Sequence, residues 1–205
     1  MSRPALACIW MASGQGKRFG SNKLLAQLPA GTLLDYSLSA VPAHCFAQRL
    51  VVTRWPQVAA LCRSRLQPVL LHNLVDRNDV VRLAVQAIDG ADGCMFLPVD
   101  QPLVQPQSLE RLAAAFAAQP QCIHRLSWQG QGQSPVIFPA HLFCELVRLP
   151  SKKGGGAVIA AHPELVRLTA ANQAWELWDV DTPEDLERIS LLPAAARLPG
   201  ALPQI

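Results

Sequence analysis

The sequence predicts an α/β protein: a single domain of three layers, in which helices cover both faces of a mostly parallel, twisted sheet. Short continuous apolar runs, typical of strands that are buried on both faces of a parallel sheet, recur along the chain. Segments with helical spacing of apolar residues separate these runs, which is the alternation of βαβ units. With 205 residues, 50% of them apolar, the chain is long enough to bury one sizeable core.

The first strand is expected at Leu6–Met11, a run of six apolar residues that ends in a turn rich in glycine. Gly14, Gly16 and Gly20 stand in this turn. Glycine adopts positive φ and allows close backbone approach, so that successive N–H groups can converge on one anion. The end of the first strand is therefore a candidate anion site.

Three cations lie in the same turn: Lys17, Arg18 and Lys23. A guanidinium donates two parallel hydrogen bonds to a phosphate, and an ammonium adds a mobile point charge where a leaving pyrophosphate gathers negative charge. We therefore expect Arg18 and Lys23 to act on phosphates. Spacing alone is equally consistent with a glycine-rich loop that carries solvated cations.

Two familiar phosphate-binding motifs do not fit this turn. The glycines are spaced G-x-G-x-x-x-G, which differs from the dinucleotide fingerprint. Gly16-Lys17 is followed by Arg18, where a P-loop has Ser or Thr.

A different pattern does fit. The segment Ala12–Leu24 resembles A-A-G-x-S-x-R-M-G-x-x-K-L, the signature loop of nucleotidyltransferases of the molybdenum-cofactor and sugar-nucleotide type. It departs from that pattern at Ser13, Gly16 and Phe19 and keeps the other glycines, the arginine and the last lysine. Within this MobA-like group, the chain is most similar to molybdenum cofactor cytidylyltransferases and to the related accessory proteins of molybdenum hydroxylases.

Composition excludes several classes of protein. The net charge is +3 and the basic residues are scattered, so no nucleic-acid partner is expected. No apolar run reaches 18 residues, so we expect no membrane span. Arg3 is the only cation before the first expected strand, and that run of six apolar residues is too short for the core of a signal peptide, so we expect a cytoplasmic location. The six cysteines are widely spaced without a C-x-x-C pair, which predicts that most of them are small buried hydrophobic residues rather than parts of a zinc or redox site.

The middle of the chain continues the alternation of strands and helices. Asn78 or Asp79 is expected to cap the helix that follows it. In open sheets of this kind, ligands bind beyond the carboxyl ends of the strands. The expected strands are 50–52, 68–71 and 94–97, and the expected helices are 57–65, the segment with Val81, Ala84, Val85 and Ile88, and the segment after Pro106 with Leu109, Leu112, Ala113 and Phe116.

Asp100 follows the strand expected at 94–97, at the sheet edge where the glycine-rich turn also emerges. Magnesium prefers one or two carboxylates with phosphate oxygens and water, so Asp100 is the first candidate metal ligand. The alternative is an aspartate that starts a turn before Pro102.

The segment 175–181 reads as a strand that runs into a helix, with Thr182 as hydroxyl cap and Asp185 in the first turn. Alternation along that strand places Asp179 and Asp181 on the same side, so one of them is expected to face the metal. The resemblance favours Asp181, because the D-x-D-T-P-E-D-L ending is similar to that of the family.

Two later segments are candidates for acceptor binding. A mobile polar loop is expected at 129–135, before a strand and a helix, and such loops commonly shape specificity. It contains Ser134, where relatives often have His or Asn. The segment 152–156 resembles a family segment near the acceptor, and it is either an anion site at a helix start, with Lys153, or a solvated basic turn.

The resemblance covers roughly residues 6–189 and implies the fold of nucleotide-diphospho-sugar transferases, with a Rossmann-like domain at 1–192 and a loosely held tail at 193–205 rich in Pro and Ala. It implies transfer of a nucleotide, CMP more than GMP, from CTP or GTP to molybdopterin, with a molybdenum hydroxylase as a further partner. The implied contacts are Ala12, Ser13, Gly14, Gly16, Arg18, Lys23 and Asn73 with the nucleotide, Asp100 and Asp181 with Mg²⁺, and Ser134 and Lys153 with the acceptor.

Two other classes of protein share features with this sequence. A nicotinamide-dependent oxidoreductase should have an acidic residue at the end of the second strand, where this chain has Thr53-Arg54. A non-catalytic chaperone that holds the cofactor for a hydroxylase would share the fold, but retention of Arg18, Lys23, Asp100 and Asp181 argues for turnover. Catalysis by such residues is positioning and charge neutralisation, so no nucleophilic side chain is expected, and the histidines are expected to be non-catalytic.

Overall fold

The computed structural model describes residues 4–14, 16, 19–151 and 153–192. Within them, seven strands form one sheet in the order β5-β4-β1-β6-β8-β7-β9. Neighbouring strands are parallel except at β8, which is antiparallel to both β6 and β7. The strands are β1 (Leu6–Met11), β4 (Gln48–Thr53), β5 (Val69–Leu71), β6 (Gly93–Pro98), β7 (Ile123–Trp128), β8 (Gln131–Pro139) and β9 (Val166–Ala170).

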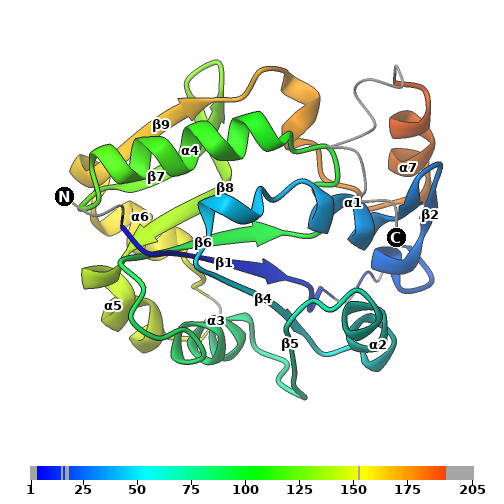
Figure 1. Ribbon diagram of the computed structural model, residues 1–205, viewed down its shortest axis with the longest axis horizontal. Helices are drawn as coiled ribbons and strands as arrows, with labels where there is room; N and C mark the ends of the chain where they lie inside the picture. Colours follow the sequence, from blue (N-terminus) through cyan, green and yellow to red (C-terminus); the bar gives the residue numbers. More distant parts are fainter. Residues whose placement is uncertain (1–3, 15, 17–18, 152, 193–205) are drawn as a thin grey trace.

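Helices cover both faces of this sheet. Figure 1 shows α4 above the sheet and α3 and α5 below it, which confirms the predicted three-layer α/β architecture. The helices are α1 (Leu33–Ser39), α2 (Pro56–Ser64), α3 (Arg77–Gln86), α4 (Pro106–Ala118), α5 (Phe143–Arg148), α6 (Gly156–Ala161) and α7 (Pro183–Ser190), and a small ribbon is formed by β2 (Gln27–Leu28) and β3 (Gly31–Thr32).

Each face of the sheet has its own core. Ile9 and Trp10 are neighbours on β1 and both are fully buried, but their side chains point to opposite faces. Trp10 packs in the core that contains Phe116 of α4, whereas Ile9 packs in the core that contains Val85 of α3 and Leu146 of α5. Because both faces are buried, the central strands are continuously apolar, and that is why their positions were predictable.

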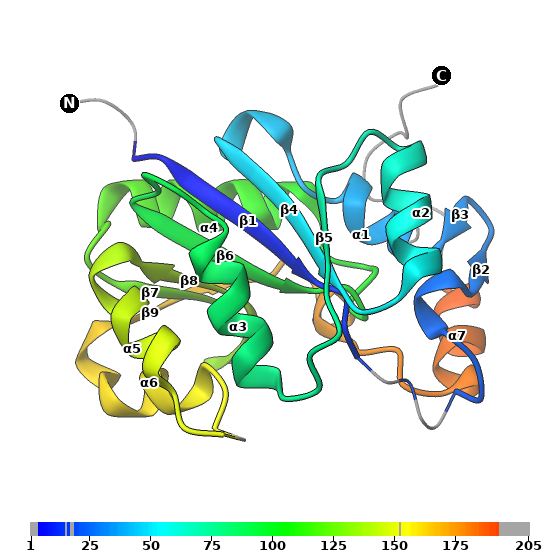
Figure 2. The ribbon, with the colours of Figure 1, turned by 90° about the horizontal axis from the view of Figure 1, so that it is seen from below.

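The ends of β1 and β6 define one edge of the sheet. These strands pair in parallel, with Met11 opposite Pro98, so the loops that follow them emerge side by side. Figure 2 shows α7 and the β2–β3 ribbon beyond this edge. The loop after β1, the loop after β6 and the segment before α7 are thereby brought together.

The start of α3 differs from the prediction. The cap is Asp76, whose side chain accepts the N–H of Asn78 at 2.8 Å, and not Asn78 or Asp79. Asn78 is buried in the first turn, where its side chain accepts the Gly154 N–H at 2.9 Å and donates to the Pro150 carbonyl. Asn78 therefore connects α3 to the segment before α6, and Asp76 caps the helix instead.

The strand predicted at 175–181 is also wrong. Ala174–Leu177 is a 3₁₀ turn, and 178–181 has no regular structure. The reason is Glu176, which is fully buried and accepts the backbone N–H groups of Asn172, Gln173 and Gln105 at 2.7, 3.1 and 3.2 Å. A buried carboxylate requires such donors, and the chain curls around it to supply them.

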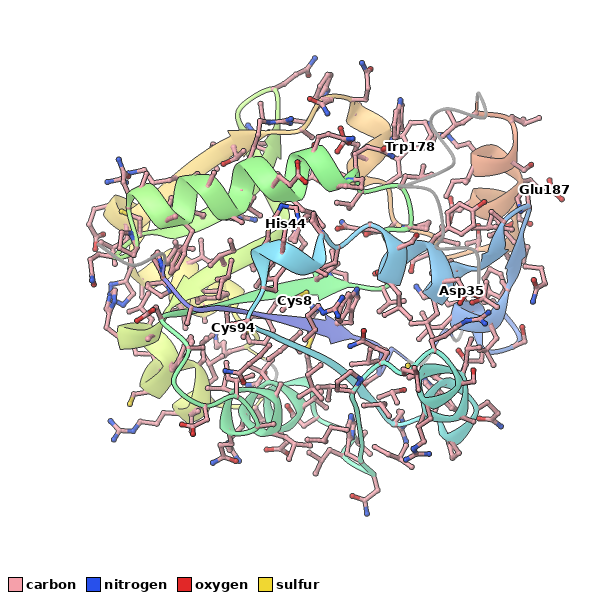
Figure 3. The ribbon with its side chains drawn as sticks, viewed as in Figure 1. Cys8, Asp35, His44, Cys94, Trp178 and Glu187 are labelled. Carbon is pink, nitrogen blue, oxygen red and sulfur yellow. The ribbon has the colours of Figure 1, made fainter. Side chains whose placement is uncertain are left out.

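The helix predicted after this segment is confirmed. Thr182 and Asp185 form a capping box at the start of α7. The guanidinium carbon of Arg188 lies 3.7 Å from the ring centre of Trp178, so α7 also packs on the segment that leads into it. Trp178 is labelled in Figure 3.

The polar segment 129–135 is not a loop, contrary to expectation. Residues 129 and 130 alone form the turn of a hairpin, with φ of 48° at Gln129 and 78° at Gly130, and β8 begins at Gln131. Positive φ at both positions suits a tight turn between twisted antiparallel strands. The register shifts between Arg125 and Ser127 of β7, so that β8 bulges opposite them.

The cysteines behave as predicted from their spacing. All six are free thiols; five are buried and Cys144 on α5 is exposed. Burial raises the pKa of the Cys8 and Cys94 thiols well above the usual range and raises that of Cys62 to about 11. Figure 3 places Cys8 and Cys94 in the centre of the sheet. None of the described helices combines the length and apolar character needed to cross a membrane.

Gly93, the first residue of β6, makes a testable contact. A Cβ atom there would lie 2.8 and 2.9 Å from ring carbons of Phe116, which is 1% exposed and has no room to move. We expect Gly93→Ala to lower the free energy of unfolding by about 1–3 kcal/mol through overpacking. Urea denaturation measures this, with Gly156→Ala as control because nothing lies within 4 Å of its added Cβ. Equal stability of the two variants would contradict the close packing at Gly93.

Candidate active site

Lys23 is the centre of the site. It lies in the 3₁₀ turn Lys23–Leu25, and its side chain is 7% exposed. Its ammonium donates to Asp100 Oδ2 at 2.9 Å, to Asp181 Oδ1 at 2.9 Å and to the Val180 carbonyl at 2.8 Å. These three acceptors match the three protons of an ammonium group.

Backbone contacts hold the two aspartates where Lys23 meets them. Asp100 follows β6, and its carbonyl accepts the N–H of Val180 at 2.8 Å. The N–H of Asp181 donates to Asp185 Oδ2 at 2.9 Å, so the capping box of α7 also fixes Asp181. The acidic pair, Asp100 and Asp181, is therefore held in place by the end of β6 and by the start of α7.

Charge pairing dominates the electrostatics of this cluster. Burial by itself lowers the pKa of the Lys23 ammonium, but Asp100 and Asp181 outweigh burial and raise it. Burial, together with the charges of Asp100 and Asp181, raises the pKa of the Asp179 carboxyl. Lys23 therefore stays charged at neutral pH, and Asp179 lies in an environment that disfavours further negative charge.

Asp100 and Asp181 have the chemistry of a site for a hard divalent cation. Their side chains are 30% and 40% exposed, and they already share one cation, the Lys23 ammonium. No group of three or more His, Cys, Asp or Glu residues suited to a metal occurs among the described residues. Two carboxylates are enough for magnesium when phosphate oxygens and water complete its coordination, so the pair fits.

A cavity of about 290 Å³ adjoins Asp100, one of the two aspartates. It lies between the loop after β1, the end of β6 and the segment between β5 and α3. Asp100 lines it together with Ser13 and Gly14 from the glycine-rich turn, while Leu74 and Val75 provide apolar surface. The cavity therefore has a polar side next to the carboxylates and an apolar side.

The glycine-rich turn is anchored at its start. The Ala12 N–H donates to the Val52 carbonyl at 2.9 Å, and the Ala12 carbonyl accepts the Thr53 hydroxyl at 2.9 Å. The indole N–H of Trp55 donates to the Gly14 carbonyl at 3.1 Å. β4 and the residues after it thus hold the turn against the cavity.

His72 contacts this turn, which the sequence did not reveal. Its Nδ1 accepts the Leu74 N–H at 3.0 Å, so Nε2 carries the proton and donates to Ser13 Oγ at 2.8 Å. Ser13 Oγ in turn donates to the Val52 carbonyl at 3.1 Å. Burial and the nearby charge of Arg54 lower the pKa of His72, which favours this neutral form. His72 therefore orients the Ser13 hydroxyl.

The remaining residues predicted to contact the nucleotide do not all lie at this cavity. Gly16 has φ of 55°, as a turn glycine requires, and Arg18 lies outside the described residues, as does Lys17. Asn73 is exposed and is not among the residues that line the cavity, although Leu74 beside it is. The tail at 193–205 also lies outside the described residues.

The two candidate acceptor residues are not together. Ser134 on β8 lines a second cavity next to the first. Lys153 is exposed and lines neither of these cavities. Arg77 lines both cavities, although the sequence analysis did not single it out, because its position at the start of α3 becomes informative only when the strands are assembled.

Comparison with known proteins agrees with this geometry. Residues 8–166 match the model of the MobA-like NTP transferase domain. The chain is 26% identical over 206 residues to the purine catabolism protein PucB of Bacillus subtilis (strain 168), covering 92% of this chain and 98% of that protein.

Solved structures share the fold. Rv0371c from Mycobacterium tuberculosis H37Rv has a TM-score of 0.77 at 25% identity, covering 91% of this chain and 98% of that one. Its complex with manganese has a TM-score of 0.70 at 22% identity, with the same two coverages of 91% and 98%. A nucleotidyl transferase from Methanothermobacter thermautotroptrophicus has a TM-score of 0.77 at 21% identity, covering 91% and 96%.

The matched segment contains the glycine-rich turn, Lys23, Asp100 and the strand residues that line the two cavities. It makes up more than half of the chain. The chain therefore belongs to the family of MobA-like NTP transferase domains and is a nucleotidyltransferase.

Proposed function

We propose that this protein transfers CMP from CTP to a phosphorylated acceptor of the molybdopterin type and releases pyrophosphate. The observation that carries the proposal is the Lys23 ammonium held between Asp100 and Asp181 at the mouth of the glycine-rich turn. The resemblance of that turn to molybdenum cofactor cytidylyltransferases supports CTP and this acceptor, and a molybdenum hydroxylase is the proposed recipient of the product.

The first cavity supports the binding of a nucleotide. Its apolar side, with Leu74, Val75 and Val80, suits a base, and its polar side leads to the acidic pair. Val80 has no side-chain donor, so we assign base recognition to the backbone of Ala12 and Ser13 and to the segment that ends at Asn73. The triphosphate would then extend toward Gly14, Gly16 and Lys23, with Arg18 as a further cation in the proposal.

Asp100 and Asp181 would hold a magnesium ion, which when bound neutralises phosphate charge as pyrophosphate leaves. The manganese complex of Rv0371c supports a divalent metal in this role. Lys23 offsets one of the two carboxylate charges, and a triphosphate would offer the ammonium a second set of anionic oxygens. Such catalysis is positioning and charge neutralisation, so no nucleophilic side chain is needed.

Nucleotide binding is the first test. We expect calorimetry to show that CTP binds more tightly than GTP, ATP or UTP, and that magnesium strengthens binding because it links the phosphates to the two carboxylates. Titrations with EDTA in place of magnesium are the control. If none of the four triphosphates binds, the enzymatic proposal is wrong.

The second test concerns Lys23. We expect Lys23→Ala to raise the barrier to nucleotide transfer by about 2–4 kcal/mol, measured as a loss in kcat/KM, because it removes one preorganised donor to developing phosphate charge. Arg63→Ala on the exposed side of α2 removes a cation away from the site and serves as control. A change of less than about threefold in Lys23→Ala would place phosphate stabilisation elsewhere.

The third test separates the carboxylates by their demand for magnesium. Asp100→Asn should keep the shape of the site, remove one charge and require the most magnesium for half-maximal rate. Asp181→Asn should show a smaller defect because an amide oxygen still coordinates a hard cation. Asp179→Asn should show the smallest, since the Lys23 ammonium pairs with Asp181. A larger defect in Asp179→Asn than in Asp181→Asn would reverse the assignment.

A further inference from the structure

The second cavity adjoins the first cavity, but neither Asp100 nor Asp181 lines it. Its volume is about 170 Å³, and it shares Met11, Arg77 and Pro98 with the first cavity. Met11 and Pro98 are cross-strand partners at the ends of β1 and β6. A ligand in the second cavity would therefore lie next to the nucleotide, on the other side of this pair of residues.

Most of this cavity is apolar. Phe96 of β6 and Phe138 of β8 form its floor and pack edge to face, with ring centres 6.0 Å apart. Leu146 of α5 and Ile159 of α6 close it from the helical layer. Aromatic and aliphatic walls of this kind suit a flat apolar ring.

Arg125 interrupts this apolar lining, as do Arg77 and Ser134. It projects from β7, and its Nε is buried without a hydrogen-bond partner among the described residues. Burial lowers the pKa of its guanidinium. The residues that line the cavity include Arg77 and Arg125 and no carboxylate, so the positive charge lacks an acidic partner there. A buried donor in this state is costly unless a ligand accepts its hydrogen bond.

The strands are shaped to admit this guanidinium. A Cβ atom on Gly132 would lie 2.9 Å from Leu168 Cδ2, 3.0 Å from Arg125 Nη1 and 3.1 Å from Arg125 Cζ, so a side chain at position 132 would crowd the guanidinium. The irregularity of β8 begins next to the pair of Arg125 with Val136, and Ser134, which lies within it, lines the same cavity. Glycine and bulge together provide the room that Arg125 occupies.

We propose that the second cavity is the acceptor subsite and that it binds a flat ring bearing an oxyanion, with the ring against the aromatic floor and the oxyanion held by Arg125. Its role as acceptor subsite rests on the proposed function, whereas the binding of a ring with an oxyanion does not. The guanidinium supplies paired donors for a phosphate or carboxylate, and the aromatic floor contacts the ring. Arg125 lines the second cavity but not the first, so it is a specificity residue for the acceptor rather than for the nucleotide.

The test uses phenyl phosphate as the probe, with phenol and inorganic phosphate as its two halves. In calorimetric titrations of the full chain, phenyl phosphate is expected to bind at least about tenfold more tightly than phenol, because a charge-assisted hydrogen bond adds to ring contact. Arg125→Met should abolish that difference and leave phenol binding unchanged. Arg148→Met, which removes an exposed arginine from α5, should bind as the unmodified protein does.

A further variant keeps the result decisive. Gly132→Ala retains the charge but crowds the guanidinium, so it should also weaken phenyl phosphate binding if Arg125→Met is unstable. If phenyl phosphate does not bind the unmodified protein, or binds Arg125→Met equally well, the proposal is overturned.

Titrating CTP into the same samples separates this proposal from the proposed function. Retained CTP binding in Arg125→Met, with loss of phenyl phosphate binding, supports both. If no sample binds CTP but phenyl phosphate binding still requires Arg125, the ring and oxyanion site stands and the nucleotidyl transfer proposal fails. If CTP binds and phenyl phosphate does not, the function stands and the assignment of the second cavity is wrong.

Discussion

The arrangement of the site depends on one ammonium group. Lys23 joins three parts of the chain that are far apart in sequence, since its acceptors lie 77, 157 and 158 residues away. The two negative charges would repel each other without it, because their carboxylates approach the same point. The turn after β1, the end of β6 and the start of α7 can therefore adopt their positions only together.

The parallel pairing of β1 and β6 determines how the two cavities are related. Met11 and Pro98 end these strands side by side and contribute to both cavities, so a short partition separates them. The first cavity has Asp100 at its edge and the second has Arg125, so the two cavities differ in one charged lining residue, although Arg77 lines both. A transfer reaction between two bound molecules needs this kind of division, in which each partner has its own contacts and the reacting groups meet at a shared edge.

Local sequence was sufficient where burial alone decides structure. β1, β4 and β6 were predictable because strands covered on both faces are continuously apolar, and the capping box at Thr182 was predictable because its spacing is local. Asp100 was proposed from its place after a strand and Asp181 chiefly from the family resemblance. The structure brings both onto one ammonium, and their binding of a metal stays a prediction. Long-range contacts were beyond such reasoning. The three backbone donors that bend the chain around Glu176 include one from residue 105, and Arg125 gains its place from a glycine and a bulge on the next strand. The pairing of His72 with Ser13 spans 59 residues and follows no motif.

The distribution of cysteines allows the opening of the fold to be followed by the reactivity of its thiols. In the folded chain, Cys144 is the one exposed thiol among six. Of the five buried ones, Cys8, Cys45 and Cys62 lie in the core on one face of the sheet and Cys94 in the core on the other, while Cys122 is buried outside both cores. Burial also raises the pKa of Cys8, Cys62 and Cys94, which keeps these sulfurs in the unreactive thiol form. A thiol reagent would therefore modify α5 at once and reach the remaining sulfurs only as each layer separates from the sheet. The order in which they react would show which layer loosens first, without any substitution in the chain.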